Sequence, residues 1–277
     1  MLVSLNDVLK TAEERSCAIA AINTPNLESL RAVIDSAEKF GVPVILGHAE
    51  LHEEVAPLDI IGPVMLLAAE QSKVPVCVHL DHCETLSYME RALELGFTGV
   101  MYDGSVLPYE ENVANTITAV RMAKKYGAGV EAEIGQMASR EGGTAAAGPV
   151  YTDPDVAEKF VQETGIDALA ASFGTAHGIY KSKPVLDIDR VAAIKEKTGI
   201  PLVMHGGSGV SPEDYRKSIK AGIRKINYYS YMARAGVSAV SDMLNQGDLT
   251  FYHDAALAAQ KAMAADVEKA MKVFYGI

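Results

Sequence analysis

Short apolar segments that alternate with amphipathic ones are the feature of this sequence that most limits its fold. Eight of these segments are apolar on both faces and follow glycine or proline breaks, as parallel strands covered by helices do. We expect the strands at residues 17–22, 44–47, 75–80, 99–103, 129–134, 168–173, 201–205 and 224–227. Eight such units in 277 residues predict an α/β fold of the (β/α)8 TIM-barrel type, with a doubly wound open sheet as the alternative.

The two ends of the chain add helices to this pattern. Residues 4–14 predict an extra N-terminal helix, and residues 231–245 and 255–275 predict a C-terminal helical extension. No segment between them has the composition of a linker, so we expect one barrel domain over residues 1–277. The last helix carries more apolar surface than a lone barrel needs, which favours packing against a second copy of the chain.

Composition excludes several classes of function. The formal net charge is −11, which argues against broad nucleic-acid binding because that needs a basic surface. No run of about 18 apolar residues predicts a membrane span, and the N-terminus does not resemble a signal peptide. The three cysteines are widely spaced and odd in number, which favours reduced thiols. We therefore expect a cytoplasmic protein.

Three histidines stand at the ends of three expected strands. They are His82 in VCVHLDHC, His177 in LAASFGTAHG and His205 in IPLVMHGGSG. A single histidine at such a position is more often structural, but the carboxyl ends of barrel strands meet at one mouth. Three imidazoles with one open position are typical of catalytic zinc. Of the other histidines, His79 is expected in the core or behind the site.

Carboxylates and glycines flank these histidines. Asp81 precedes His82 directly, and the spacing leaves open whether it orients an imidazole or acts as an acid and base. Glu131 and Glu133 share one face of a strand, which is costly inside the barrel unless they meet a cation. The tract that follows His205 is either a simple turn or a phosphate cradle. Residues after the last strand would complete that cradle: Asn227, Tyr228, Tyr229 and Ser230.

The combination of motifs resembles one known family. HLDHC, VMYDGSVLPYEENVANT, VEAEIG, YTDP, GTAHG and HGGSG occur in this order in class II metal-dependent ketose-bisphosphate aldolases, and the resemblance covers nearly the whole chain. It implies a zinc-dependent (β/α)8 barrel that cleaves a ketose 1-phosphate to dihydroxyacetone phosphate and an aldehyde. Fructose or tagatose 1,6-bisphosphate is the usual substrate. The resemblance also implies a homodimer or homotetramer, and a monovalent cation (Na⁺ or K⁺) near the phosphate.

The resemblance also implies roles for individual residues. Zinc would be bound by His82, His177 and His205, and Asp81 would act as acid and base at the C4 hydroxyl. Glu141, in the long segment after the fifth strand, would exchange the C3 proton. Asp103, Glu131 and Glu133 would support the ligands. The phosphorylated half of the substrate would contact Gly178, Gly206, Gly207, Ser208, Asn227, Tyr228, Tyr229 and Ser230. Asn23 is also expected to bind the substrate.

The sequence departs from the family where the aldehyde half would bind. Arg140 replaces an acidic neighbour of Glu141, His48 and Ala49 stand where many relatives have serine, and no arginine follows Arg234. Arg140 either faces solvent or suits an anionic tail, which would be a phosphate or a sulfonate such as that of a 6-sulfo-ketose 1-phosphate. We see no lysine at a matching strand end, which argues against a Schiff base. A sugar-phosphate isomerase or epimerase and a non-catalytic sugar-phosphate binder are the alternatives.

Overall fold

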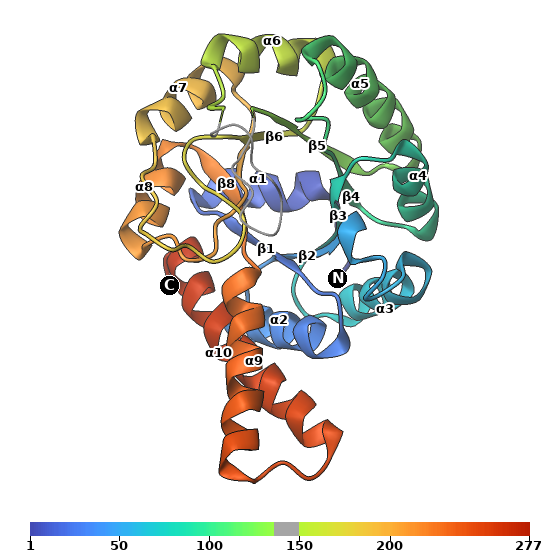
Figure 1. Cartoon of the computed structure of the whole chain (residues 1–277). Helices are drawn as coiled ribbons and strands as arrows, with labels where there is room; N and C mark the ends of the chain where they lie inside the picture. Colours follow the sequence, from blue (N-terminus) through green and yellow to red (C-terminus); the bar gives the residue numbers. More distant parts are fainter. Residues whose placement is uncertain (136–149) are drawn as a thin grey trace.

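A closed barrel of eight parallel strands forms the centre of the structure (Figure 1). The computed structural model describes residues 1–135 and 150–277. Each strand pairs with the next along the chain, and β8 pairs with β1, which excludes the open sheet. The (β/α)8 prediction is therefore confirmed. The strands are β1 Ile19–Asn23, β2 Val44–Ala49, β3 Val76–Cys83, β4 Gly99–Tyr102, β5 Gly129–Ile134, β6 Ala168–Ala171, β7 Leu202–Met204 and β8 Ile223–Asn227.

Helices surround the barrel, and local sequence signals mark many of their ends. In α2, the side chains of Asn26 and Ser29 cap each other's backbone N–H groups, and Gly41 ends the helix in a left-handed conformation. The helices are α1 Leu5–Arg15, α2 Leu27–Phe40, α3 Leu58–Gln71, α4 Leu86–Leu95, α5 Tyr109–Tyr126, α6 Pro154–Thr164, α7 Ile188–Thr198, α8 Pro212–Ala221, α9 Ser230–Gln246 and α10 Tyr252–Tyr275, with a short 3₁₀ helix η1 at Glu50–His52.

Helix α1 closes the N-terminal end of the barrel. Its buried face, which includes Leu5 and Leu9, packs against inward-facing strand residues such as Ile19, Ile45 and Met101. In Figure 1 this helix lies across the barrel. The lower interior is therefore a packed apolar core, as in other barrels of this type. Polar side chains are left to the opposite, C-terminal end of the strands.

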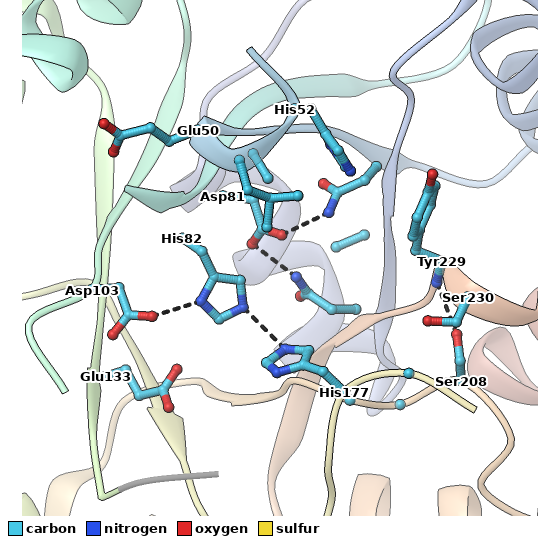
Figure 2. A pocket seen from close by; sticks show the side chains of 18 of the residues that line it. Glu50, His52, Asp81, His82, Asp103, Glu133, His177, Ser208, Tyr229 and Ser230 are labelled. Carbon is cyan, nitrogen blue, oxygen red and sulfur yellow. Dashed lines mark hydrogen bonds and ion pairs between the residues drawn. The ribbon is translucent and has the colours of Figure 1, made fainter. Parts of the chain in front are cut away.

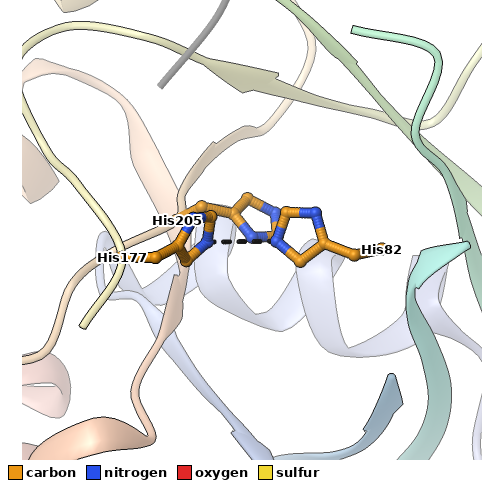
Figure 3. A group of neighbouring side chains, drawn as sticks. All are labelled: His82, His177 and His205. Atoms are coloured by element: carbon orange, nitrogen blue, oxygen red, sulfur yellow. Dashed lines mark hydrogen bonds between the residues drawn. The ribbon is translucent and has the colours of Figure 1, made fainter. Parts of the chain in front are cut away.

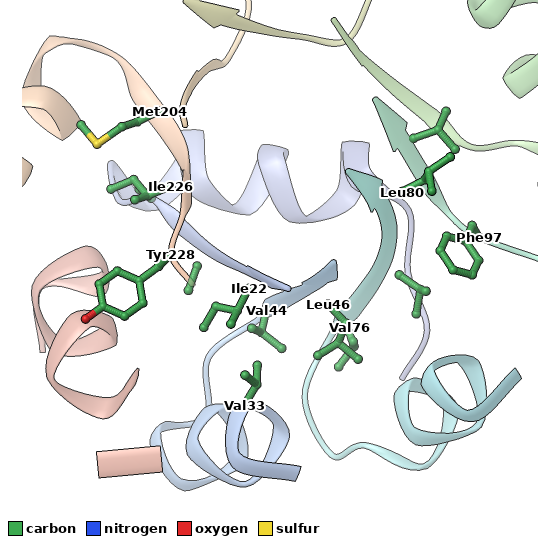
Figure 4. Packing of buried hydrophobic residues seen from close by; sticks show 14 of the residues in the cluster. Ile22, Val33, Val44, Leu46, Val76, Leu80, Phe97, Met204, Ile226 and Tyr228 are labelled. Atoms are coloured by element: carbon green, nitrogen blue, oxygen red, sulfur yellow. The ribbon is translucent and has the colours of Figure 1, made fainter. Parts of the chain in front are cut away.

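A second apolar layer lies between the strands and the surrounding helices. Outward-facing Ile22, Leu46 and Leu80 pack against helix and loop side chains that include Val33 and Phe97 (Figure 4). Burying a side chain of this size stabilises a fold by roughly 1.5–3 kcal/mol. The strands are therefore apolar on both faces for most of their length, which is the pattern that made them recognisable in the sequence.

Helices α9 and α10 form a hairpin that extends away from the barrel (Figure 1). The second half of α10 returns to the core through Val267, Met271 and Phe274. The outer part of the hairpin exposes large apolar side chains, with Val237 69% and Tyr252 86% exposed. Within residues 1–135 and 150–277, none of the helices is long and apolar enough to cross a membrane.

Candidate active site and metal centre

A cavity of about 700 Å³ opens at the C-terminal ends of the strands (Figure 2). Its size suits a small phosphorylated sugar. Most of the residues proposed from the sequence line it: Asn23, Asp81, His82, Asp103, Glu133, His177, Gly178, Gly206, Gly207, Ser208, Asn227, Tyr228, Tyr229 and Ser230. His205 and Glu131 lie fully buried behind this lining. Glu141 and Arg140 lie outside the described residues.

The three histidines proposed as metal ligands lie side by side (Figure 3). One potential ligand atom from each lies within 4.8 Å of the others, and Nε2 of His82 is 3.1 Å from Nε2 of His177. Two nitrogens bound to one tetrahedral zinc ion would be about 3.3 Å apart, given zinc–nitrogen bonds of about 2.0 Å. The spacing therefore fits a zinc ion. Potential ligand atoms of His82, Asp103 and Glu133 also lie within 4.8 Å of one another.

A local change of backbone conformation brings His82 into this group. The pairing of β3 with β4 shifts register between Leu80 and Cys83, and His82 adopts a φ of 44°. This left-handed conformation is unfavourable for a residue with a side chain, and strained residues of this kind cluster at functional sites. The ring then lies with Nδ1 2.7 Å from Oδ2 of Asp103. With Nδ1–H donating to Asp103, Nε2 is directed at the other two histidines.

His205 is oriented by a buried carboxylate. Its Nε2 is 2.6 Å from Oε1 of Glu131, and its Nδ1 is buried without a hydrogen-bond partner. A buried imidazole nitrogen without a partner is costly, and a metal ion would satisfy it. The orientation of a ligand by a carboxylate on its other nitrogen is common in zinc sites. The residues present therefore fit a catalytic zinc centre.

The surroundings of His82 and His177 shift the pKa values of these two histidines in opposite directions. Burial alone would lower the pKa of His82, but the charges of Asp81, Asp103 and Glu133 and the hydrogen bond to Asp103 raise it to about 10. Burial and the charge on His82 lower the pKa of His177 to about 3. In the protein without metal, the imidazole of His82 is therefore protonated on both nitrogens at neutral pH. A metal ion that binds Nε2 must displace the proton there.

Asp81 is held between two amides at the wall of the cavity. Nδ2 of Asn23 donates to one carboxylate oxygen and Nδ2 of Asn227 donates to the other, each over 2.9 Å. Burial would raise the pKa of Asp81, but the positive charges of His82 and its other neighbours hold it well below its usual range. Gly47 leaves room for Asn23, because a Cβ there would collide with Oδ1 of Asn23. Asp81 is therefore an ionised carboxylate at a fixed position.

Glu131 and Glu133, expected on one face, have different environments. Burial would raise the pKa of Glu131, but Lys225 and the hydrogen bond from His205 hold it at about 2. Glu133 is buried with Oε2 unpartnered, and burial together with the charge of Asp103 raises its pKa well above its usual value. Glu131 meets the cation that the sequence argument required, whereas burial disfavours the charged form of Glu133, which lies beside His82.

One lysine that received no role from the sequence lies in the barrel interior, two residues before the end of its strand. Lys225 lies on β8, fully buried, with Nζ 2.8 Å from Oε2 of Glu131. Its spacing of two from Asn227 could have revealed that both side chains face the barrel interior. It does not line the cavity, and its ammonium group is occupied by Glu131, so a Schiff base gains no support.

Two more residues line the cavity that the sequence analysis did not propose as site residues. Glu50 and His52 line it from η1, and the His52 ring lies 5.5 Å from that of Tyr229. They are visible in Figure 2 on the side away from Ser208. Their position depends on a single turn of 3₁₀ helix after β2, which has no clear sequence signal.

The opposite side of the cavity is built from backbone groups. Gly206 has a φ of 62°, and a Cβ on it would lie 2.6 Å from the backbone of Ala176. The Oγ of Ser208 accepts from the backbone N–H of Tyr229 at 2.9 Å, and α9 starts at Ser230 without a side-chain cap. Open N–H groups at the start of a helix attract anions. This corner is therefore suited to a phosphate group.

Tyr228 and Tyr229 point in different directions. The Tyr228 hydroxyl donates to Asp266 on α10 over 2.7 Å, and its ring belongs to the outer apolar layer (Figure 4). The side chain of Tyr229 lies at the cavity (Figure 2). Tyr229 can therefore contact a ligand in the cavity through its side chain, whereas Tyr228 can do so only through its backbone.

Comparison with known proteins identifies the family. The family model for fructose-bisphosphate aldolase class II matches residues 3–276. A Bacillus subtilis protein described as "probable fructose-bisphosphate aldolase" is 38% identical over 88% of this chain and 86% of its own. A Staphylococcus aureus fructose-bisphosphate aldolase is also 38% identical over the same shares. The crystal structure of the YdjI aldolase from Escherichia coli K12 superposes with a TM-score of 0.89, at 32% identity, over 99% of this chain and 97% of its own. The chain belongs to the class II fructose-bisphosphate aldolase family and is an aldolase, an enzyme that breaks and forms a carbon–carbon bond.

Proposed function

We propose that this aldolase is zinc-dependent and reversibly cleaves a ketose 1-phosphate to dihydroxyacetone phosphate and an aldehyde. The observation that carries the proposal is the meeting of three imidazoles with an ionised Asp81 at one cavity. Nδ1 of His205 is buried without a partner, and ligand atoms of all three rings lie within 4.8 Å of one another. A binding protein would need the phosphate corner but not this arrangement.

His82, His177 and His205 would hold the zinc ion. When bound, zinc supplies a Lewis acid that withdraws electrons from the substrate carbonyl. The chain contributes the orientation of its ligands, because Asp103 and Glu131 each accept a hydrogen bond from one ring and leave its other nitrogen for the metal. The three-imidazole set also binds other divalent transition metals, so metal content has to be measured.

Asp81 would act as the base in the cleavage direction. Its ionised carboxylate accepts the proton of the C4 hydroxyl as the C3–C4 bond breaks, and the bonding electrons remain with C3. Glu141 would then protonate C3. In the synthetic direction the two proton transfers reverse. The amides of Asn23 and Asn227 hold Asp81 in place for this step, which is the kind of positioning that general base catalysis requires.

The phosphate of the substrate would bind at the corner formed by Gly178, Gly206, Gly207, Ser208 and the start of α9. The N–H groups of the first turn of α9 are not capped by a side chain, and the glycines let backbone approach backbone closely. A monovalent cation beside this phosphate, as the family resemblance implies, remains a prediction.

The aldehyde half of the substrate would lie toward Glu50 and His52, on the far side of His82 from the phosphate corner. Fructose and tagatose 1,6-bisphosphate are candidates, as are related ketoses such as a 6-sulfo-ketose 1-phosphate. No lysine or arginine in residues 1–135 and 150–277 lines the cavity. A cation for an anionic tail would therefore have to come from elsewhere, and Arg140 is our candidate.

Assembly into a homodimer or homotetramer is also proposed. The exposed apolar side chains of the α9–α10 hairpin, including Val237 and Tyr252, support it, because such surface is unfavourable in water. Sedimentation equilibrium gives the stoichiometry directly. A monomer at micromolar concentration would contradict the proposal.

The experiment that tests the proposed function is release of dihydroxyacetone phosphate by the purified protein, assayed with and without chelator. The panel contains fructose and tagatose 1,6-bisphosphate, singly phosphorylated ketoses and a 6-sulfo-ketose 1-phosphate. We expect release from at least one member, lost on chelation and regained with zinc. Release that persists in a strong chelator would contradict zinc dependence. An altered sugar without triose phosphate would indicate an isomerase or epimerase instead.

A further inference from the structure

Lys225 is the centre of a chain of contacts that joins the two halves of the catalytic machinery. Its Nζ lies 2.8 Å from Oε2 of Glu131, whose other oxygen contacts Nε2 of His205. The same Nζ donates over 2.8 Å to Oδ1 of Asn227, whose Nδ2 donates to Asp81. Lys225 and Glu131 are both fully buried. Water therefore does not compete for these contacts.

The direction of each hydrogen bond follows from what each group can donate. A lysine ammonium group can only donate, so the atom of Asn227 that faces it must be the carbonyl oxygen. This leaves the NH₂ group of Asn227 for the carboxylate of Asp81, which can only accept. Without Lys225, either end of the amide could face Asp81, and the oxygen would repel it.

The same reasoning applies on the Glu131 side. A buried carboxylate needs a cation partner, because an uncompensated charge in the interior is very unfavourable. Of the groups near Glu131, Lys225 lies at 2.8 Å, whereas His79 lies at 3.7 Å and its pKa is lowered by burial to about 3. Paired in this way, Glu131 remains an acceptor for Nε2–H of His205. The Nδ1 atom of His205 is then the one available to a metal.

We propose that Lys225 is a positioning residue that sets both the metal-binding tautomer of His205 and the orientation of the Asn227 amide at Asp81. It does not line the cavity, so it acts through Glu131 and Asn227 rather than on the substrate. One buried ammonium group thus positions both the metal ligand that follows β7 and the acid–base group on β3. This inference rests on the proposed roles of His205 and Asp81.

Two variants separate the two actions of Lys225. Lys225→Met removes the ammonium group and keeps a similar length. The double variant Lys225→Met/Glu131→Gln also removes the buried negative charge, while the amide oxygen of glutamine can still accept from His205. Ile45→Ala, which opens a cavity in the apolar floor of the barrel, is the control for general destabilisation. Melting temperature and circular dichroism are recorded for all three.

The first measurement is zinc affinity, obtained by competition with a chromophoric chelator, and it does not depend on activity. Changes behind a metal ligand typically cost 10- to 100-fold in affinity or activity. We expect Lys225→Met to weaken zinc binding by about this factor, and the double variant to recover to within about threefold of the parent, because it restores a neutral acceptor for His205. Ile45→Ala should bind zinc like the parent.

The second measurement is kcat and KM at saturating zinc on the preferred ketose 1-phosphate. Both Lys225 variants should keep a kcat at least about tenfold below that of the parent, because neither restores the donor to Asn227. Recovery of both zinc affinity and kcat in the double variant would mean that Lys225 only neutralises the charge of Glu131. That result would overturn the proposal. So would parental values in Lys225→Met, or an equal loss in Ile45→Ala. Failure of the parent itself to bind zinc would contradict the proposed function instead.

Discussion

Nδ1 of His82 lies 2.7 Å from Oδ2 of Asp103, at the point where β3 turns into the left-handed conformation and β4 ends. The contact leaves Nε2 of His82 facing His177. The other carboxylate oxygen, Oδ1, accepts from the backbone N–H of Ser105 at 3.1 Å. We infer that this loop contact holds Asp103 in place for the ring of His82.

Replacing Asp103 by alanine should weaken zinc binding by about 10- to 100-fold, since the His82 ring loses the acceptor that fixes its orientation and tautomer. Chelator competition measures the affinity. Asp153→Ala is the matched control, because it also removes a carboxylate. Asp153 caps the start of α6 and does not line the cavity. Equal zinc affinities in Asp103→Ala and the parent would contradict the role assigned to Asp103.

Zinc binding should become tighter as the pH rises. The pKa of His82 in the metal-free protein is raised to about 10, above the value of about 6.5 in an unfolded chain. Zinc must displace this proton, so the logarithm of the affinity should increase by about one per pH unit between roughly pH 6.5 and 10. Calorimetry in buffers of different ionisation enthalpy counts the protons released.

The raised pKa of His82 should make the fold of the metal-free protein less stable as the pH rises. Its charged His82 stabilises the fold fully below pH 6.5, and this contribution is lost as the pH rises through about 10. Urea unfolding of the chelated protein across this range should show the decline, and His82→Gln should reduce it. Zinc affinity that does not change between pH 7 and 9 would contradict the assigned protonation state.

Replacing Asp81 by asparagine should abolish most of the turnover while leaving the metal in place. The change preserves shape but removes the base, and loss of general acid–base catalysis typically costs about 10²- to 10⁴-fold in rate. Release of dihydroxyacetone phosphate gives kcat, and metal analysis gives zinc content. A variant with full zinc and nearly unchanged kcat would show that another group takes the C4 hydroxyl proton.

Much of the fold was accessible from the sequence because the local signals agree with the tertiary structure. The glycine and proline breaks and the helix caps, such as Asn26 with Ser29 and Gly41, act within a few residues and located the elements to within a few positions. Helix α3 has weaker local signals, because Pro63 lies inside it and no side chain caps its start.

The candidate site was predictable where it depends on strand ends and less so where it depends on distances across the barrel. The grouping of His82, His177 and His205 was predictable because all three lie at the ends of strands. The contrast between Glu131, whose pKa is lowered, and Glu133, whose pKa is raised, was not, because it depends on Lys225 of β8 lying opposite β5. The φ of His82 likewise depends on a register shift against β4. Glu141 and Arg140, outside the described residues, remain predictions from the family resemblance.

Glu141→Ala should separate proton exchange from carbon–carbon bond cleavage. If Glu141 transfers the C3 proton, the variant should exchange the C3 proton of dihydroxyacetone phosphate with solvent much more slowly, with a loss of about 10²-fold or more. Nuclear magnetic resonance in D₂O follows this exchange without any cleavage step. Glu110→Ala, a change in the first turn of α5, serves as control. Exchange at the parental rate would assign the proton transfer to another residue.

Arg140→Ala tests what kind of tail the substrate carries. The described lining of the cavity contains acidic residues, including Glu50 and Glu84, and neither lysine nor arginine. If Arg140 supplies the cation, its loss should raise KM about tenfold or more for ketose 1-phosphates with a phosphate or sulfonate at C6, since a charge-assisted hydrogen bond is worth about 1.5–3 kcal/mol. Substrates with an uncharged tail should change little.

Arg140→Lys sharpens this test, because it keeps the charge but not the planar pair of donors that matches a phosphate or sulfonate. We expect it to fall between the parent and Arg140→Ala on substrates with charged tails, and to equal the parent on uncharged ones. A loss of the same size on both kinds of substrate would mean that Arg140 acts on the reaction in general. No loss on either kind would place it in solvent. In that case the described part of the cavity wall, which contains Glu50 and Glu84 but neither lysine nor arginine, would favour an aldehyde that carries no negative charge.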